Sequence, residues 1–439
     1  MPQLEKGSKK LLNAWAFYDW ANSVYSLVIA TAVFPIFYTE LFPEGQTHIA
    51  ILGTSVKSTA LISFVTAFAF LLVAFISPLL SGIADYSGNK KIFLKLFCYL
   101  GALSCIGLYW FSLENIYWSL VCYFFGLVGF WGSLVFYNSY LPDIAFPDQQ
   151  DRVSAKGFSM GYIGSVLLLI FNLAMVMFPG SFGLKEIEGL EHPSIRAMRI
   201  SFVSVGVWWI LFSQYTYYYL PKGTRKNKVT HHVLLNGFRE LKKVWGELKL
   251  NLTLKRYLGA FFVYSMAVQT VMLVATYFGA EEIDWGEDSG AKRTGLIVSI
   301  LLIQLVAVGG AIATSRLSEK YGNIKTLIGI NIIWAIICIC AFFLTLPIHF
   351  YITAGFVGLV MGGIQSLSRS TYSKFLPETK DTASFFSFYD VTEKIGIVIG
   401  MLLYGAIDQI FGSMRYSIVF LTLFFIIGIF LLRRVLKKS

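Results

Sequence analysis

Charged and amide side chains within long apolar stretches are the candidates for chemistry in this sequence. Asp19 begins a long uncharged stretch, and Asn22 follows it by three residues. In a helix this spacing places both side chains on one face. A second group, Asp390, Glu393 and Lys394, lies close together inside another apolar stretch. Such groups are costly in a hydrocarbon environment unless they are paired or hydrated, so they predict a polar space that binds protons or polar molecules.

The composition indicates the environment of these groups. Of the 439 residues, 56% are hydrophobic and only 14% are charged, which is typical of a protein that crosses the membrane many times. No cleavable signal peptide is expected, because the first apolar stretch is a full span without a small-residue cleavage site. The five cysteines lie in apolar stretches and the five histidines lie in or beside loops, so we expect no metal and no cofactor.

Twelve apolar stretches are long enough to cross a bilayer. They cover residues 15–39, 59–84, 92–113, 116–138, 157–178, 200–220, 257–280, 294–315, 326–346, 348–371, 384–410 and 416–433. Most of the 36 lysines and arginines fall in connections on one side, and the positive-inside rule makes that side and both termini cytoplasmic. The net charge of +11 therefore follows from topology, and we expect a lipid bilayer and no nucleic acid as partner.

The longest basic connection, 221–256, divides the stretches into two groups of six. It predicts an N-terminal half over 1–220, a cytoplasmic basic linker over 221–256 and a C-terminal half over 257–439. Apolar residues recur at helical spacing within the linker, among lysines and arginines: Leu234, Phe238, Leu241, Trp245 and Leu248. This pattern predicts an amphipathic helix on the inner leaflet.

The two halves repeat one another. Segment 81–91 aligns with 315–325, and segment 137–143 aligns with 372–378 at nearly the same offset. Six spans return the chain to its starting side, so the halves have the same orientation. This is the parallel repeat of a transporter whose site lies between its halves near the midplane. We predict an all-α integral membrane protein of twelve transmembrane helices in two pseudo-symmetric six-helix halves.

Segment 81–91 resembles the signature loop of the major facilitator superfamily. It keeps Asp85, Gly88 and Lys90 but departs from the pattern at Ser81, Tyr86 and Asn89. The resemblance implies the major facilitator fold. Asp85 ends the second span on the side where the eleventh begins, so its carboxylate is expected against the free N–H groups of that helix.

The repeat places Glu319 in the corresponding position, against the start of the fifth span. We expect a latch that closes the cytoplasmic side, formed by Asp85, Gly88, Lys90, Glu319 and Gly322. The alternative is a basic turn that only sets topology.

Four stretches carry a narrower resemblance. They are 18–23 with 34–35, 137–142, 154–164, and 362–370 with 385–394. Through them the chain is similar to the family of fungal autophagy-related vacuolar amino-acid effluxers and their bacterial relatives. The family implies transport of a solute, with an amino acid or small peptide favoured.

The fold resemblance also implies which residues bind the solute, because the first, fourth, seventh and tenth spans line the central cavity. Their polar and aromatic candidates are Asp19, Asn22, Tyr25, Trp131, Tyr137, Asn138, Gln269, Gln365, Ser368 and Arg369. Amides offer donors and acceptors together, and aromatic rings offer apolar or cation–π contacts. This lining suits a small polar or zwitterionic solute.

The eleventh span provides candidates for ion coupling. Asp390 and Lys394 have the favourable order and spacing for an ion pair within one helix. Glu393 is then expected to have no partner in this helix. We expect the coupling proton to be bound among Asp19, Asp390, Glu393 and Lys394, while Arg369 or Lys394 meets an anionic group of the solute. A structural charge cluster that braces this span is the alternative.

These observations predict a proton-coupled secondary active transporter, a monomer in the plasma (inner) membrane if the cell is bacterial. No phosphate-binding glycine loop is present and no histidine lies well inside a span, which argues against an ATP-driven pump and an enzyme. Sodium is the alternative coupling ion. A translocator of lipids or lipid-linked headgroups on the same fold is the alternative function, although it would favour a wider basic cavity.

Overall fold

The computed structural model describes residues 4–42, 48–51, 53–187, 191–223, 233–286 and 289–436, and these contain twelve helical runs long and apolar enough to cross a membrane. The runs are α1 (Lys9–Val24) continued by η1 (Tyr25–Val33) and α2 (Phe34–Glu40), α3 (Ser58–Ser87), α4 (Lys90–Gly107), α5 (Ile116–Asn138), α7 (Pro147–Met177), α8 (Pro193–Tyr219), α10 (Leu252–Glu282), α11 (Ser289–Tyr321), α12 (Asn323–Ala341), α13 (Pro347–Phe375), α14 (Thr382–Phe411) and α15 (Met414–Leu436). Shorter elements are β1 (His48–Ile51), β2 (Thr54–Lys57), η2 (Leu108–Trp110), α6 (Leu141–Ile144), η3 (Pro179–Phe182) and α9 (Val233–Leu250).

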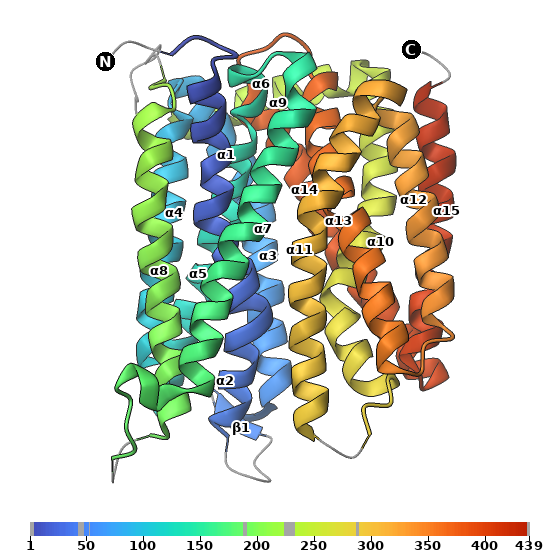
Figure 1. The fold of residues 1–439 in the computed structure, drawn as a ribbon. Coiled ribbons are helices and arrows are strands. Elements are labelled where there is room, and N and C mark those ends of the chain that lie inside the picture. The colour runs from blue at the N-terminus through green and yellow to red at the C-terminus, as the bar shows by residue number, and fades with distance from the viewer. Residues whose placement is uncertain are drawn as a thin grey trace.

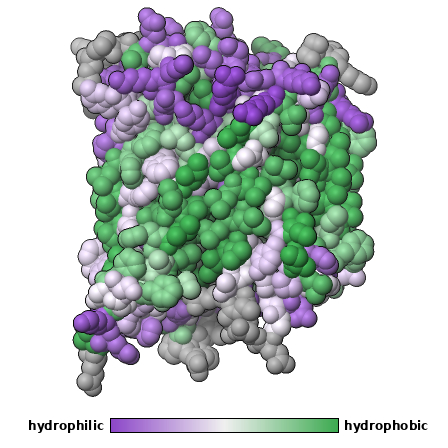
Figure 2. Space-filling view, viewed as in Figure 1, coloured by the Kyte–Doolittle hydropathy of each residue, from purple (hydrophilic) through white to green (hydrophobic). Residues whose placement is uncertain are grey.

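The helices run roughly side by side, and both ends of the chain lie at the same end of the molecule, here called the termini side (Figure 1). A broad apolar band crosses the middle of the surface, and hydrophilic residues gather above it on the termini side (Figure 2). Many large apolar side chains in the spans are nevertheless exposed, among them Phe64 (66%) and Phe75 (77%). Lipid contact accounts for this exposure, so the predicted all-α multi-pass membrane fold is confirmed.

Buried apolar residues form two clusters that follow the chain. One cluster lies between Leu11 and Leu220 and also takes in Ala383, while the other lies between Val244 and Val435 and also takes in Tyr162. Across the division, α7 packs on α11 and α13, and α3 packs on α14. Ala383 and Tyr162 therefore mark places where the two groups of helices meet.

Glycines permit the close helix contacts that shape this packing. Gly101 on α4 faces Gly129 on α5, and a Cβ atom on Gly129 would come within 2.3 Å of the Gly101 backbone. Gly362 approaches the Ala307 carbonyl in the same way, where α13 crosses α11. Small residues at such crossings let backbones approach closely, and the resulting van der Waals packing contributes to helix association in membranes.

The first span contains an unexpected stretch of π-helix, η1. The Thr31 hydroxyl donates a hydrogen bond to the Ser26 carbonyl five residues earlier, at 2.9 Å. This wider turn changes the faces that the second half of the span presents. The sequence patterns also did not predict the antiparallel hairpin of β1 and β2 before α3.

The helix predicted in the linker is α9, which lies at the termini side. Val244 and Leu248 are buried against the protein, while Phe238 and Trp245 are 60% and 45% exposed. The expectation of a helix resting only on the leaflet is therefore incomplete, because α9 also packs on α3 and α14. Residues 224–232 of the predicted linker lie outside the described residues.

Candidate functional site

An ion pair between the two halves lies at the centre of the candidate site. Arg369 of α13 approaches Asp19 of α1, with Nη2 at 3.2 Å from Oδ2, and the two side chains are 3% and 6% exposed. Tyr137 of α5 donates a further hydrogen bond to the same carboxylate oxygen, at 2.9 Å. Breaking a buried pair by removing one partner typically costs about 3–5 kcal/mol. The halves are therefore held together here by opposite charges.

Arg369 has several further partners from the N-terminal half. Its guanidinium donates to the Ser154 hydroxyl at 2.9 Å, to the Ser154 carbonyl at 3.0 Å and to the Asn138 amide oxygen at 3.2 Å. It also lies 4.8 Å from the ring centroid of Trp15 and 4.2 Å from that of Phe158. The charge is thus enclosed by acceptors and aromatic faces, the surroundings that recognise a planar cation.

Close packing of α1 on α7 holds this centre together. A Cβ atom on Gly157 would lie 2.4 Å from an Asp19 carboxylate oxygen, and one on Gly161 would lie 2.4 Å from the Ser23 hydroxyl oxygen. Neither position has room for a side chain. The glycines of α7 therefore let α1 approach closely enough for Asp19 to reach Arg369.

A second charged cluster lies between α14, α10 and α5. The Lys394 ammonium pairs with Asp390, lies 3.6 Å from a Glu393 oxygen and 3.9 Å from the ring centroid of Trp131. Gln269 donates a hydrogen bond to Glu393 at 2.9 Å. The expectation that Glu393 has no partner is therefore wrong. With all three groups ionised the cluster carries one net negative charge, whereas Asp19 and Arg369 together are neutral.

Exposure differs between the two clusters. Lys394 is 1% exposed, but the Glu393 side chain is 17% exposed, and Gln269 and Trp131 are also only partly buried. The second carboxylate oxygen of Asp390, Oδ2, is buried and has no hydrogen-bond partner among the described residues. Glu393 is thus the accessible acid of this cluster.

Gln365 also joins the two halves. Its amide oxygen accepts a hydrogen bond from the Tyr162 hydroxyl of α7 at 2.7 Å, and its side chain is partly buried. Asn22 is buried on α1, where its oxygen accepts a weak hydrogen bond from Ser23. Its amide nitrogen has no partner among the described residues.

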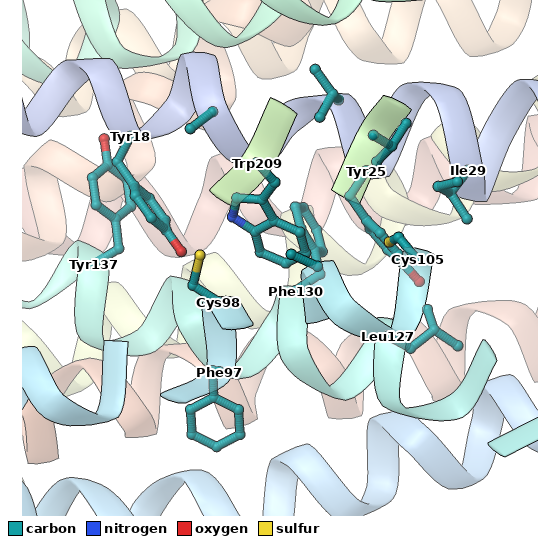
Figure 3. Packing of buried hydrophobic residues seen from close by; sticks show 14 of the residues in the cluster. Tyr18, Tyr25, Ile29, Phe97, Cys98, Cys105, Leu127, Phe130, Tyr137 and Trp209 are labelled. Carbon is teal, nitrogen blue, oxygen red and sulfur yellow. The ribbon is translucent and has the colours of Figure 1, made fainter. Parts of the chain in front are cut away.

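Two of the predicted solute-binding residues, Tyr25 and Ser368, each point into the core of their own half rather than toward the other half. The Tyr25 ring stacks on Phe130 at 5.0 Å between centroids and lies 6.0 Å from Trp209, inside the N-terminal core (Figure 3). Tyr25 follows Asp19 by six residues, and at about 100° per residue this places it roughly 120° around the first span from Asp19. Ser368 bonds Tyr264 of α10 at 2.8 Å and so points into the C-terminal core.

At the termini side, α3 and α14 meet through the predicted latch loop. The Asp85 carboxylate accepts hydrogen bonds from the Ala383 and Ser384 amides, at 3.2 and 2.7 Å, in the first turn of α14. Gly88 ends α3 with φ +67°, a left-handed conformation that favours glycine. Lys90 pairs with Asp143 at 2.5 Å and donates to the Thr382 hydroxyl, so it spans both halves.

The corresponding contacts at α11 and α7 differ from the expectation. Glu319 contacts the start of α7 through the Arg152 guanidinium, at 3.0 Å, rather than through backbone amides, and the Arg152 side chain is 77% exposed. Asp151, which the sequence analysis did not select, accepts bonds from Lys374 at 2.6 Å and from Ser318 at 2.9 Å. Gly322 begins α12 with φ +83°.

The linker helix adds a tether at the same end. Lys243 of α9 pairs with Asp381 at 2.8 Å, immediately before α14, and with Glu240 at 3.0 Å. Hydrogen bonds to Asp381 and Glu240 raise the pKa of Lys243, so this ammonium remains charged at neutral pH. On the other side of α9, Gly237 lies directly against Gly82 of α3.

Sequence reasoning missed several residues of the centre, all of them on the fifth span or at the start of the first. They are Trp15, Ser154, Phe158 and Tyr162. One signal pointed to them, because Gly157, Gly161 and Gly164 recur at helical spacing and predict a close helix contact. No group of three potential metal ligands occurs in the part of the chain that the structure describes.

The fold is the one found in transporters of the major facilitator type. The fucose:proton symporter FucP of E. coli has a TM-score of 0.69, covering 97% of each chain at 16% identity. The proton:xylose symporter XylE has a TM-score of 0.68, covering 97% of this chain and 95% of its own, at 11% identity. These likenesses establish the fold.

Sequence comparison establishes the family. Residues 7–438 match the family model described as "Vacuole effluxer Atg22 like". The MFS-type transporter YxiO of Bacillus subtilis is 31% identical, over 97% of this chain and 95% of its own. Autophagy-related protein 22-1 of Phaeosphaeria nodorum is 22% identical, over 93% and 87%. The chain therefore belongs to the Atg22-like family of major facilitator transporters, and its relatives are transporters rather than enzymes.

Proposed function

We propose that this protein is a proton-coupled secondary active transporter of a small zwitterionic solute, an amino acid or a small peptide, that works by alternating access. The Asp19–Arg369 pair between α1 and α13 is the observation that carries the proposal. A transporter that rocks its halves apart must separate this pair in each cycle. A solute carboxylate replaces Asp19 as the partner of Arg369 and so offsets the cost of separation.

The second cluster supplies the coupling ion in this proposal. Glu393 is partly exposed and belongs to a cluster with one net negative charge, so binding of one proton neutralises the cluster. A buried neutral cluster crosses between states at lower electrostatic cost than a charged one. Trp131 and Gln269 lie beside these groups, and Gln365 lies at the contact with Tyr162 of α7. In this proposal the three residues provide apolar and amide contacts for the rest of the solute.

Topology and closure complete the proposal. We infer that the termini side is cytoplasmic, because the basic connections gather there, and that a monomer functions in the inner membrane of a bacterial cell. Asp85, Gly88, Lys90, Glu319 and Gly322 then form the closure of the cytoplasmic side. The basic linker over 221–256 joins the halves 1–220 and 257–439, and its helix α9 supports this closure through Lys243.

A ligand screen by thermal shift tests the proposed substrate class. The purified protein is heated in the presence of amino acids, dipeptides, sugars, nucleosides or lipid headgroups. A ligand of the folded state raises the melting temperature by mass action, by an amount that grows with its concentration. We expect amino acids or dipeptides to raise it, and the response to be lost in Gln365→Ala and Asp19→Asn. A response only to lipid headgroups would instead favour a lipid translocator.

A further inference from the structure

The basic pocket between α4 and α8 does not belong to the candidate transport site. It lies at the termini side, has a volume of about 700 Å³, and is lined by Lys91, Lys95 and Lys222 together with Gln214, Tyr217 and Tyr218. Among the described residues that line it, none is acidic. The pocket therefore concentrates positive charge without a carboxylate of its own to balance it.

The lysines are held in place from within the pocket. Lys91 is only 8% exposed, and its ammonium donates a hydrogen bond to the Leu220 carbonyl at 2.8 Å. The Lys95 ammonium lies 5.2 Å from the ring centroid of Tyr217. Gln214 accepts a hydrogen bond from the Tyr99 hydroxyl at 3.2 Å and donates one to the Ile210 carbonyl at 2.7 Å, which leaves its second amide N–H for a ligand. An ammonium as buried as that of Lys91 is stabilised by an anion at hydrogen-bond distance.

The surroundings of the pocket are those of a lipid site. Lys91 and Lys95 lie in the first turns of α4, and Lys222 follows the end of α8, so the charges lie at the termini-side ends of both spans. Next to them, apolar side chains point outward: Ile92 is 52% exposed, Leu96 is 56% exposed and Tyr218 is 57% exposed. A molecule bound here meets positive charge at one end and an apolar, lipid-facing surface at the other.

We propose that this pocket binds the headgroup phosphate of an anionic phospholipid from the leaflet on the termini side. Its three lysines and the Gln214 amide would bind the phosphate, while the acyl chains lie along the exposed faces of α4 and α8. Basic pockets between transmembrane helices recognise anionic lipid headgroups by this combination of charge and depth. The inference does not depend on the transported solute.

The structure offers a matched control at the same side of the other half. A smaller pocket of about 290 Å³ between α11 and α12 contains a single lysine, Lys325, among mostly apolar residues. A single ammonium attracts a phosphate much more weakly than the three lysines of the pocket between α4 and α8. Lys325→Gln therefore removes a termini-side lysine from a pocket that should not select anionic lipid.

The test compares melting temperatures in mixed micelles. Wild-type protein, the double variant Lys95→Gln/Lys222→Gln and Lys325→Gln are heated in phosphatidylcholine alone or with increasing phosphatidylglycerol. Each lysine near a charged surface contributes roughly a fivefold gain in affinity, so the double variant should bind about 30-fold more weakly. We expect phosphatidylglycerol to stabilise wild type and Lys325→Gln, and to stabilise the double variant only at much higher lipid fractions.

Two results would overturn the proposal. An equal response of wild type and the double variant to phosphatidylglycerol would assign the effect to other parts of the surface. An equal rise of the wild-type melting temperature with millimolar inorganic phosphate would mean that the pocket recognises a free anion rather than a lipid. The melting temperature in phosphatidylcholine alone shows that each variant is folded. Loss of solute transport would not affect any of these readings, so failure of the proposed function remains distinguishable.

Discussion

Gly157→Ala tests the Asp19–Arg369 contact without removing a charge. The added Cβ would lie 2.4 Å from an Asp19 carboxylate oxygen, 3.0 Å from Arg369 Nη2 and 3.2 Å from the Tyr137 hydroxyl oxygen. Because non-bonded atoms prefer about 3.5 Å, Asp19 must withdraw by roughly 1 Å from its present position. That movement takes the carboxylate away from Arg369 while α1 and α7 are forced apart.

The expected magnitude follows from the overfilling of this site. Overfilling a tightly packed site costs about 1–3 kcal/mol. Alanine is also favoured over glycine within a helix by about 0.5–1 kcal/mol, but this gain is the same in the closed and open arrangements and does not change the balance between them. The closed arrangement of the termini side therefore loses about 1–3 kcal/mol, a shift of roughly 5- to 160-fold toward the open arrangement.

Distance measurements between two spin labels, by pulsed electron paramagnetic resonance, report this shift. Spin labels are attached at Asp148→Cys on α7 and Lys320→Cys on α11, two exposed termini-side positions on opposite halves, with the native cysteines replaced. Gly157→Ala should enlarge the population with long distances. Gly259→Ala is the matched control, because its Cβ would meet no atom within 4 Å. Equal distance distributions in wild type and Gly157→Ala would refute the tight contact described here.

Three further changes test the closure and its parts. Asp19→Asn leaves Arg369 with Ser154, Asn138 and the rings, so we expect a shift of about 2 kcal/mol toward the open arrangement in the same distance measurement, with no such shift for Asp408→Asn. Asp85→Asn weakens the contact with the first turn of α14 and should open the termini side by about 1 kcal/mol; an unchanged distribution would exclude a closing role. Lys243→Gln removes the tether from α9 to Asp381, and because the lysine side chain is 54% exposed the effect should stay below about 1 kcal/mol. Hydrogen exchange of α9 should become faster in this variant, and an unchanged rate would show that burial of Val244 and Leu248 alone holds the helix.

The fold was predictable because membrane spans have a strong sequence signal. A span needs a long apolar stretch and little else, so the twelve helices could be located from composition alone. Details that depend on local hydrogen bonding were not predictable. The π-helix η1 and the hairpin of β1 and β2 involve no charged or apolar pattern that distinguishes them from ordinary helix and loop.

The candidate site was only partly predictable. A charged residue inside a span needs a partner or water, so the sequence alone indicated Asp19, Arg369, Asp390 and Lys394 as candidates. The structure places them in two ion pairs, Asp19 with Arg369 and Asp390 with Lys394. Which face of a helix points to the other half depends on tertiary packing, and Tyr25 and Ser368 therefore point into the cores of their own halves. Ser154 and Tyr162 were missed because neutral hydroxyl groups in a span carry no comparable cost.

Transport in proteoliposomes tests the central claim most directly. Vesicles containing the purified protein are given a labelled amino acid or dipeptide identified in the thermal screen, with or without a pH gradient across the membrane. We expect the gradient to drive accumulation of the solute, and Glu393→Gln to exchange solute but no longer respond to the gradient. Wild-type accumulation that is indifferent to the gradient, or a full response in Glu393→Gln, would contradict proton coupling through this cluster.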